Sequence, residues 1–132
     1  MQLVIDTSAL ASVVFGEADA SAMAAVIAAN AGDLNLSAAT LVESEIVVES
    51  RQGLAALNDL RMLLRAAAVT IVPVDAEQAS LAAAGWRRFG KGRHPAGLNL
   101  GDCFSYALSK RLGAPLLFKG KDFTQTDVTS VL

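Results

Sequence analysis

The sequence has little of several residue types, and each shortage excludes a class of protein. One cysteine, Cys103, rules out an internal disulfide and fits a reducing compartment, so we expect a cytoplasmic protein. One histidine, His94, lies in a glycine-rich segment and gives little support to a Ser-His-Asp triad. No apolar run approaches the roughly 20 residues that cross a bilayer, and no signal-peptide pattern is seen, so we expect no membrane segment. The glycine-rich motifs for binding nucleoside triphosphates and dinucleotides are missing as well.

Aliphatic residues and an uneven charge distribution are what the chain does have. Hydrophobic residues make up 53% of the 132 positions and aromatic residues 5%, which suits one domain with an aliphatic core. Residues 1–86 carry ten acids and three bases, whereas residues 87–121 carry eight bases around one acid, Asp102. Such a basic segment is typical of a phosphate-facing surface with an embedded metal ligand, and an ordinary solvated surface has the same pattern.

Short apolar runs alternate with amphipathic segments along the whole chain. The apolar runs predict strands at residues 3–5, 34–36, 69–74, 116–118 and 128–132. The segments between them predict helices at 9–15, 17–31, 37–52, 54–68 and 76–89, and one that starts at Asn99 or Asp102 and ends at Gly113. This alternation predicts an α/β fold with a parallel sheet and right-handed crossovers, in which all strands end at one edge.

Four of the thirteen acidic residues occupy positions that single them out. Asp6 ends the first predicted strand, Asp122 follows the fourth, and Asp102 lies in the first turn of the helix before that fourth strand. Glu43 lies on the apolar side of its helix, where a carboxylate needs a partner. Each one alone is equally well explained as a helix cap or a surface acid. Because three of them are expected near the same sheet edge, the four together predict a cluster.

A cluster of carboxylates is unstable unless a cation neutralises it. Ligands that are all oxygen atoms favour Mg²⁺ or Mn²⁺, and Mg²⁺ keeps several waters, which leaves room for a substrate phosphate. An ion of this kind lowers the pKa of a bound water and neutralises charge on the leaving oxygen. This is the chemistry of phosphodiester hydrolysis, so the cluster predicts a metal-dependent nuclease.

Four segments of the chain, in the order in which they occur, resemble one known family. They are VIDTSAL, SAATLVESEIV, LNLGDCFSYALSK and PLLFKGKDFTQTDV. Together they resemble a PIN domain, and specifically a VapC-type toxin of a bacterial type II toxin–antitoxin pair. The resemblance covers essentially the whole chain, so it implies a single PIN domain over residues 1–132. It also implies a three-layer α/β fold, in which a parallel sheet of about five strands in the order 3-2-1-4-5 is flanked by helices.

The resemblance implies a Mg²⁺- or Mn²⁺-dependent endoribonuclease that cleaves a structured RNA such as a tRNA or rRNA. Its catalytic acids fall on Asp6, Glu43, Asp102 and Asp122, and its supporting hydroxyl falls on Thr7 or Ser8. Many relatives carry an acid or a small polar residue just before the last aspartate, where this chain has Lys121. The resemblance also implies a homodimer and a VapB-like antitoxin that joins it in a larger complex.

We assign roles to these residues as follows. Asp6 and Asp102 would bind the metal directly, and Glu43 and Asp122 would complete the pocket directly or through water. The phosphate contacts expected from the basic segment are Lys91, Arg93 and Lys119. Two alternatives stay open: a DNA or flap-type nuclease on the same fold, and a non-catalytic PIN-like module that binds RNA or protein.

Overall fold

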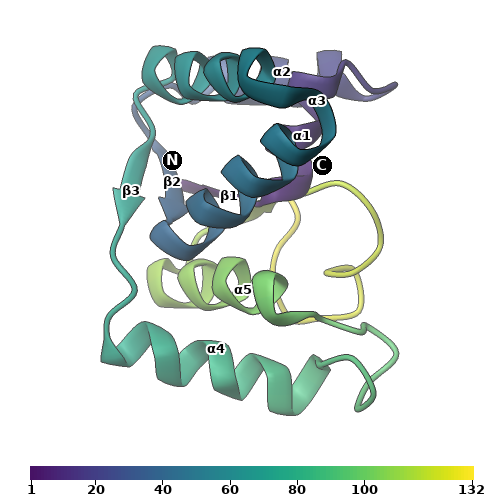
Figure 1. Ribbon diagram of the computed structural model, residues 1–132. Helices are drawn as coiled ribbons and strands as arrows, with labels where there is room; N and C mark the ends of the chain where they lie inside the picture. The colour runs from purple at the N-terminus through teal and green to yellow at the C-terminus, as the bar shows by residue number, and fades with distance from the viewer.

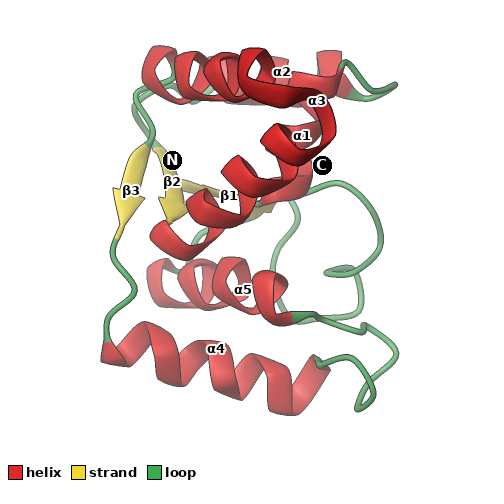
Figure 2. Ribbon diagram, in the orientation of Figure 1, coloured by secondary structure: helices red, strands yellow, loops and turns green.

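A parallel sheet of four strands forms the middle layer of the protein (Figures 1 and 2). The computed structural model describes residues 1–132. The strands are β1 (Leu3–Ile5), β2 (Leu34–Ser37), β3 (Thr70–Val72) and β4 (Leu116–Leu117). The helices are α1 (Thr7–Phe15), α2 (Ala20–Ala29), α3 (Ala38–Ala66), α4 (Ala76–Phe89) and α5 (Leu100–Leu112).

The strand order is β3-β2-β1-β4, and every neighbouring pair is parallel. β1 lies between β2 and β4 with all three residues buried, as an unbroken apolar run predicts for an inner strand. The predicted parallel sheet and its 3-2-1-4 order are therefore confirmed. The predicted fifth strand at 128–132 is reduced to one parallel bridge between Ser130 and Leu116, so the count of five is corrected to four. β4 has only two residues, which leaves little backbone for further pairing.

Helices cover both faces of the sheet and make two separate cores (Figure 1). Leu3 and Ile5 of β1 pack with α1, α2 and α3, whereas Val4 between them packs with α4 and α5. This division follows from the alternation of side chains along a strand. The predicted three-layer architecture is confirmed. The core between the sheet and α1, α2 and α3 contains no buried aromatic ring, as the aliphatic composition of the chain predicts.

Helix α3 is broken at Gly53, whose backbone angles (φ 82°, ψ −170°) are not helical. A positive φ of this size is readily adopted only by glycine. The two helices predicted at 37–52 and 54–68 are therefore two arms of α3. The first arm crosses the carboxyl edge of the sheet, and the second returns to the core through Leu57, Leu60 and Leu64 (Figure 1).

The first two helices differ slightly from their predicted ranges. α1 begins at Thr7, two residues early, because the Asp6 carboxylate accepts a hydrogen bond from the Ser8 N–H and caps the helix. α2 begins at Ala20, and its predicted first residues, 17–19, form a turn instead. No single helix is long and apolar enough to span a bilayer. Helices α1 and α2 reach the required length and hydropathy only when taken together, and they are bent by 116° relative to each other.

The predicted loop at 90–98 closes on itself. Gly90 and Leu98 form a parallel bridge at its base. Within it, the Ala96 N–H donates a 3.0 Å hydrogen bond to Nδ1 of His94, and the His94 ring packs edge-on against Phe89. His94 is thus held by its own loop, which agrees with the weak support for a catalytic histidine.

Candidate metal-binding active site

Asp6 is held from two sides at the end of β1. The residue is 4% exposed, and its Oδ2 atom accepts hydrogen bonds from the Ser8 N–H (3.0 Å) and the Ser8 hydroxyl (2.7 Å). Its Oδ1 atom accepts a 2.6 Å hydrogen bond from the hydroxyl of Ser105 in α5. These donors fix the orientation of the carboxylate while contributing no positive charge, so Asp6 keeps its capacity for a cation.

Glu43 lies on the first arm of α3 and is oriented by Thr7. The Thr7 hydroxyl donates a 2.7 Å hydrogen bond to Oε1 of Glu43 and lies 2.9 Å from the Ser44 hydroxyl. Burial raises the pKa of Glu43; the Thr7 hydrogen bond opposes this effect and the negative charge of Asp6 adds to it. Glu43 is therefore close enough to Asp6 for their charges to interact.

Gly101, at the start of α5, makes room for the Glu43 carboxylate. A Cβ atom added at Gly101 would lie 2.6 Å from Cδ of Glu43 and within 3 Å of both its oxygen atoms. No real Cβ atom tolerates contacts this short, so a side chain here would displace Glu43. The absence of a side chain at position 101 thus determines how closely α3 and α5 bring their acids together.

Asp102 is the third residue of α5 and forms a capping box with Asn99. Its amide donates a 2.9 Å hydrogen bond to Oδ1 of Asn99, and its Oδ2 accepts a 3.1 Å hydrogen bond from the Asn99 N–H. The residue is 8% exposed, and its pKa is raised to about 7, with burial as the largest cause. Within this net shift the Asn99 N–H acts to lower the pKa, while the negative charges of Asp6, Asp122 and Glu43 act with burial to raise it. A carboxylate in such surroundings is stabilised by a cation.

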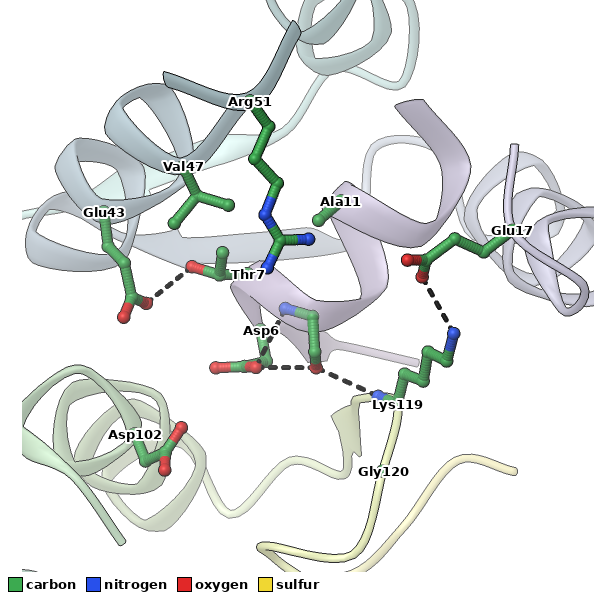
Figure 3. A pocket seen from close by; sticks show the side chains of 11 residues that line it. Asp6, Thr7, Ala11, Glu17, Glu43, Val47, Arg51, Asp102, Lys119 and Gly120 are labelled. Atoms are coloured by element: carbon green, nitrogen blue, oxygen red, sulfur yellow. Dashed lines mark hydrogen bonds and ion pairs between the residues drawn. The ribbon is translucent and has the colours of Figure 1, made fainter. Parts of the chain in front are cut away.

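These acids line one cleft at the carboxyl edge of the sheet (Figure 3). Its walls come from α1, α3, the first turn of α5 and the segment after β4. The lining residues are Asp6, Thr7, Ser8, Ala11, Glu17, Glu43, Val47, Arg51, Asp102, Lys119 and Gly120. The structure thus brings together three of the four predicted acids, both predicted hydroxyl residues and one of the three predicted bases.

Residues 3–128 of the chain match the PIN domain family. Over 129 residues the chain is 49% identical to a protein named Ribonuclease VapC from Mycolicibacterium smegmatis, an alignment that covers 98% of this chain and 99% of the relative. The chain belongs to the PIN-domain family, in its VapC group.

Solved structures show the same fold as this PIN domain. VapC20 of Mycobacterium tuberculosis, described as a sarcin-ricin loop cleaving toxin, superposes with a TM-score of 0.80 at 19% identity and covers 98% of both chains. A chain from a toxin–antitoxin complex of Klebsiella pneumoniae gives a TM-score of 0.71 at 18% identity, over 96% of this chain and 93% of that one. At these identities the agreement concerns the fold.

The remaining predicted site residues of the PIN domain lie outside the cleft. Asp122 is exposed and does not line it, although its charge is one of those that raise the pKa of Asp102. Lys91 lines an apolar pocket between α4 and α5. Arg93 stacks on the Trp86 ring at 4.8 Å, and its Nε donates to the Arg87 carbonyl. The structure therefore does not bring Lys91 and Arg93 to the acids.

Lys119 does reach the cleft of the PIN domain, but its charge is already paired. Its Nζ lies 2.8 Å from Oε1 of Glu17 and 3.4 Å from Oδ1 of Asp19. Its backbone N–H donates to the Ser8 hydroxyl at 3.0 Å, which ties the segment after β4 to α1. Lys119 thus closes one wall of the cleft.

Four residues at the site were not found from the sequence: Glu17, Arg51, Gly101 and Ser105. Two of these residues could have been found from their spacing in the sequence. Ser105 follows Asp102 by three positions, and Arg51 follows Glu43 by eight, so each shares a helix face with a predicted acid. Glu17 and Gly101 had none, because their importance comes from contacts between segments distant in sequence.

The donor set of the cleft suits a hard divalent cation. All candidate ligands are carboxylate oxygens, and neither the cysteine nor the histidine of the chain lines the cleft. No three or more acidic, histidine or cysteine side chains stand close enough together to form a complete cage. Mg²⁺ needs no such cage, because it is commonly held by one or two carboxylates, with waters filling the other positions. Asp6 and Asp102 meet this requirement.

Proposed function

We propose that this PIN domain is the toxin of a toxin–antitoxin pair and acts as a Mg²⁺- or Mn²⁺-dependent endoribonuclease. The observation that carries the proposal is the meeting of Asp6, Glu43 and Asp102 in one cleft, with no basic side chain paired to any of them. A domain that only bound RNA would gain nothing from buried carboxylates that repel its ligand. The name of the Mycolicibacterium relative supports the same activity.

Asp6 and Asp102 would hold the metal ion, and Glu43 would complete the site directly or through water. Asp122, which lies outside the cleft, would contribute through water. When bound, the ion supplies an acidified water and neutralises charge on the phosphate. One oxygen of Asp102, Oδ1, accepts none of the hydrogen bonds made by the capping box and so is available as a ligand.

The hydroxyl groups of the site would keep these carboxylates in place during the reaction. Ser8 and Ser105 hold the two oxygens of Asp6, and Thr7 holds Oε1 of Glu43. Oε2 of Glu43 accepts no hydrogen bond, so it is free to accept one from the attacking water. Preorganised acceptors of this kind lower the cost of aligning the water with the phosphodiester.

The substrate we propose is a structured RNA, such as a tRNA or an rRNA loop. The description of VapC20 as a sarcin-ricin loop cleaving toxin supports this class. A VapB-like antitoxin is the proposed protein partner, supported by the Klebsiella neighbour, which comes from a toxin–antitoxin complex. We further propose that the chain is a homodimer that forms a larger complex with that antitoxin, and that it works in the cytoplasm.

The test is cleavage of total bacterial RNA by the purified chain with Mg²⁺ or Mn²⁺, alongside an EDTA control. Asp6→Asn should abolish the discrete fragments, whereas Asp59→Asn, an exposed acid outside the cleft, should leave them unchanged. Cleavage of a DNA substrate of the same sequence is measured in parallel, and it distinguishes a ribonuclease from a DNA nuclease. Fragments that persist in EDTA or in Asp6→Asn would contradict a metal-dependent site at Asp6.

A further inference from the structure

Arg51 stands on the wall of the cleft, on the same face of α3 as Glu43. Residues 43, 47 and 51 follow one another at intervals of four, and all three line the cleft (Figure 3). Arg51 is therefore placed two helical turns from Glu43, close to the point where α3 breaks at Gly53.

The Arg51 guanidinium makes no ion pair with any carboxylate of the chain. Its carbon Cζ lies 5.4 Å from the centre of the Phe15 ring, at the end of α1, a cation–π distance that holds the group between α1 and α3. Figure 3 shows the guanidinium directed from α3 into the cleft. Its N–H donors are thus positioned and still available.

The available N–H donors of Arg51 matter because of the other charges around the cleft. Four acids line it, Asp6, Glu17, Glu43 and Asp102, against two bases. One of those bases, Lys119, is already paired with Glu17 and Asp19. Arg51 is therefore the one cationic group on the cleft wall without a carboxylate partner. An anionic backbone approaching the acids needs such a group, and the planar fork of arginine matches two phosphate oxygens.

We propose that Arg51 binds a phosphate of the RNA next to the one that is cleaved, and so sets the direction in which the strand crosses the cleft. The inference rests on the proposed ribonuclease function and adds a substrate-binding residue to it. Arg51 anchors the strand on the α3 side of the acids, opposite the segment after β4. Lys91 and Arg93, which the sequence suggested for this task, lie elsewhere.

The experiment measures binding of a short fluorescein-labelled RNA stem–loop by fluorescence anisotropy over a series of salt concentrations. All variants are made in the Asp6→Asn background, and the RNA is checked on a gel afterwards. Arg51→Ala should weaken binding about tenfold and reduce the slope of log affinity against log salt by about 0.7. Arg51→Lys should recover part of the loss, which a misfolded variant would not do. Arg65→Ala removes an exposed arginine on the second arm of α3 and should change nothing.

Equal binding by the Arg51→Ala and Arg65→Ala chains would overturn the proposal, and so would the absence of measurable RNA binding. Cleavage by chains that retain Asp6 is scored separately. There, Arg51→Ala should raise KM and leave kcat nearly unchanged. RNA binding that depends on Arg51 without any cleavage would refute the ribonuclease function and leave Arg51 as an RNA-binding residue only. RNA cleavage that does not depend on Arg51 would support the ribonuclease function and overturn the proposed role of Arg51.

Discussion

The hydroxyl of Ser105 donates a 2.6 Å hydrogen bond to Oδ1 of Asp6, although the two residues are 99 positions apart in the chain. Both are buried, and the bond joins the end of β1 to the second turn of α5. Asp102 lies one turn before Ser105 on the same helix. The bond therefore fixes the position of α5, and with it the position of Asp102, relative to Asp6.

We predict that Ser105→Ala lowers the affinity for Mn²⁺ by about ten- to a hundredfold, because an unanchored Asp6 must be ordered by the ion itself. Isothermal titration calorimetry measures this directly. The control is Ser109→Ala, one turn further along α5, which loses an equally short hydrogen bond to the Ala114 carbonyl outside the cleft. Equal losses of affinity in the two variants would show that the effect comes from α5 stability and not from Asp6.

Asp102 makes the stability of the metal-free protein depend on pH, and the direction of this dependence follows from its raised pKa. Its pKa is raised to about 7 in the folded state by burial, from a usual value of 3.8. The folded state therefore binds a proton more readily than the unfolded state, and the contribution of Asp102 to stability falls as pH rises from about 4 to about 7. Asp102→Asn, which stays neutral, should be more stable than the original chain by roughly 2–4 kcal/mol at pH 7 and equal to it below pH 4.

Urea denaturation of both chains in EDTA, from pH 4 to pH 8, measures this difference. Because all other titrating groups are shared, subtracting the two curves isolates Asp102. A gap that stays constant with pH would mean that Asp102 is not the group responsible. Added Mn²⁺ should reverse the order at pH 7, since the ion stabilises only the chain that binds it.

Gly101→Ala should reduce RNA cleavage by about ten- to a hundredfold while the fold persists, because the new Cβ displaces the Glu43 carboxylate. The matched background is Glu43→Ala, in which nothing is left to displace. There, Gly101→Ala should have no further effect on cleavage and should raise the melting temperature, since alanine favours a helix by about 1 kcal/mol over glycine. Additive losses of activity in the double variant would contradict a link through Glu43.

The sequence predicted those features that depend on local signals. Asp6 was placed by the apolar run that it ends, and Asp102 by its position in the first turn of a helix. Gly53 separates the two predicted helices at 37–52 and 54–68, because glycine is a local signal for a helix break. The inner position of β1 followed in the same way from a run of three apolar residues, each buried in the structure.

Other features depend on how distant segments pack, and no local pattern carries that information. Ser105 matters only because α5 docks beside Asp6, and Gly101 only because α3 brings Glu43 against it. Charge alone suggested Lys91 and Arg93, yet their loop folds back on α4, and Arg93 stacks on Trp86. The fifth strand shortened to one bridge because its partner β4 offers two residues, a length that the apolar run did not reveal.

The segment after β4 that closes one wall of the cleft has a consequence for synthesis of the protein. Lys119 reaches back to Ser8 and Glu17, so this wall exists only once the chain has been made beyond Lys119. A chain that stops before α5, on the ribosome or after early release, contains Asp6 without Asp102, Ser105 or Lys119. Such a fragment lacks one of the two acids proposed to hold the metal ion, so any metal-dependent cleavage by this domain would begin only after α5 and Lys119 have been made.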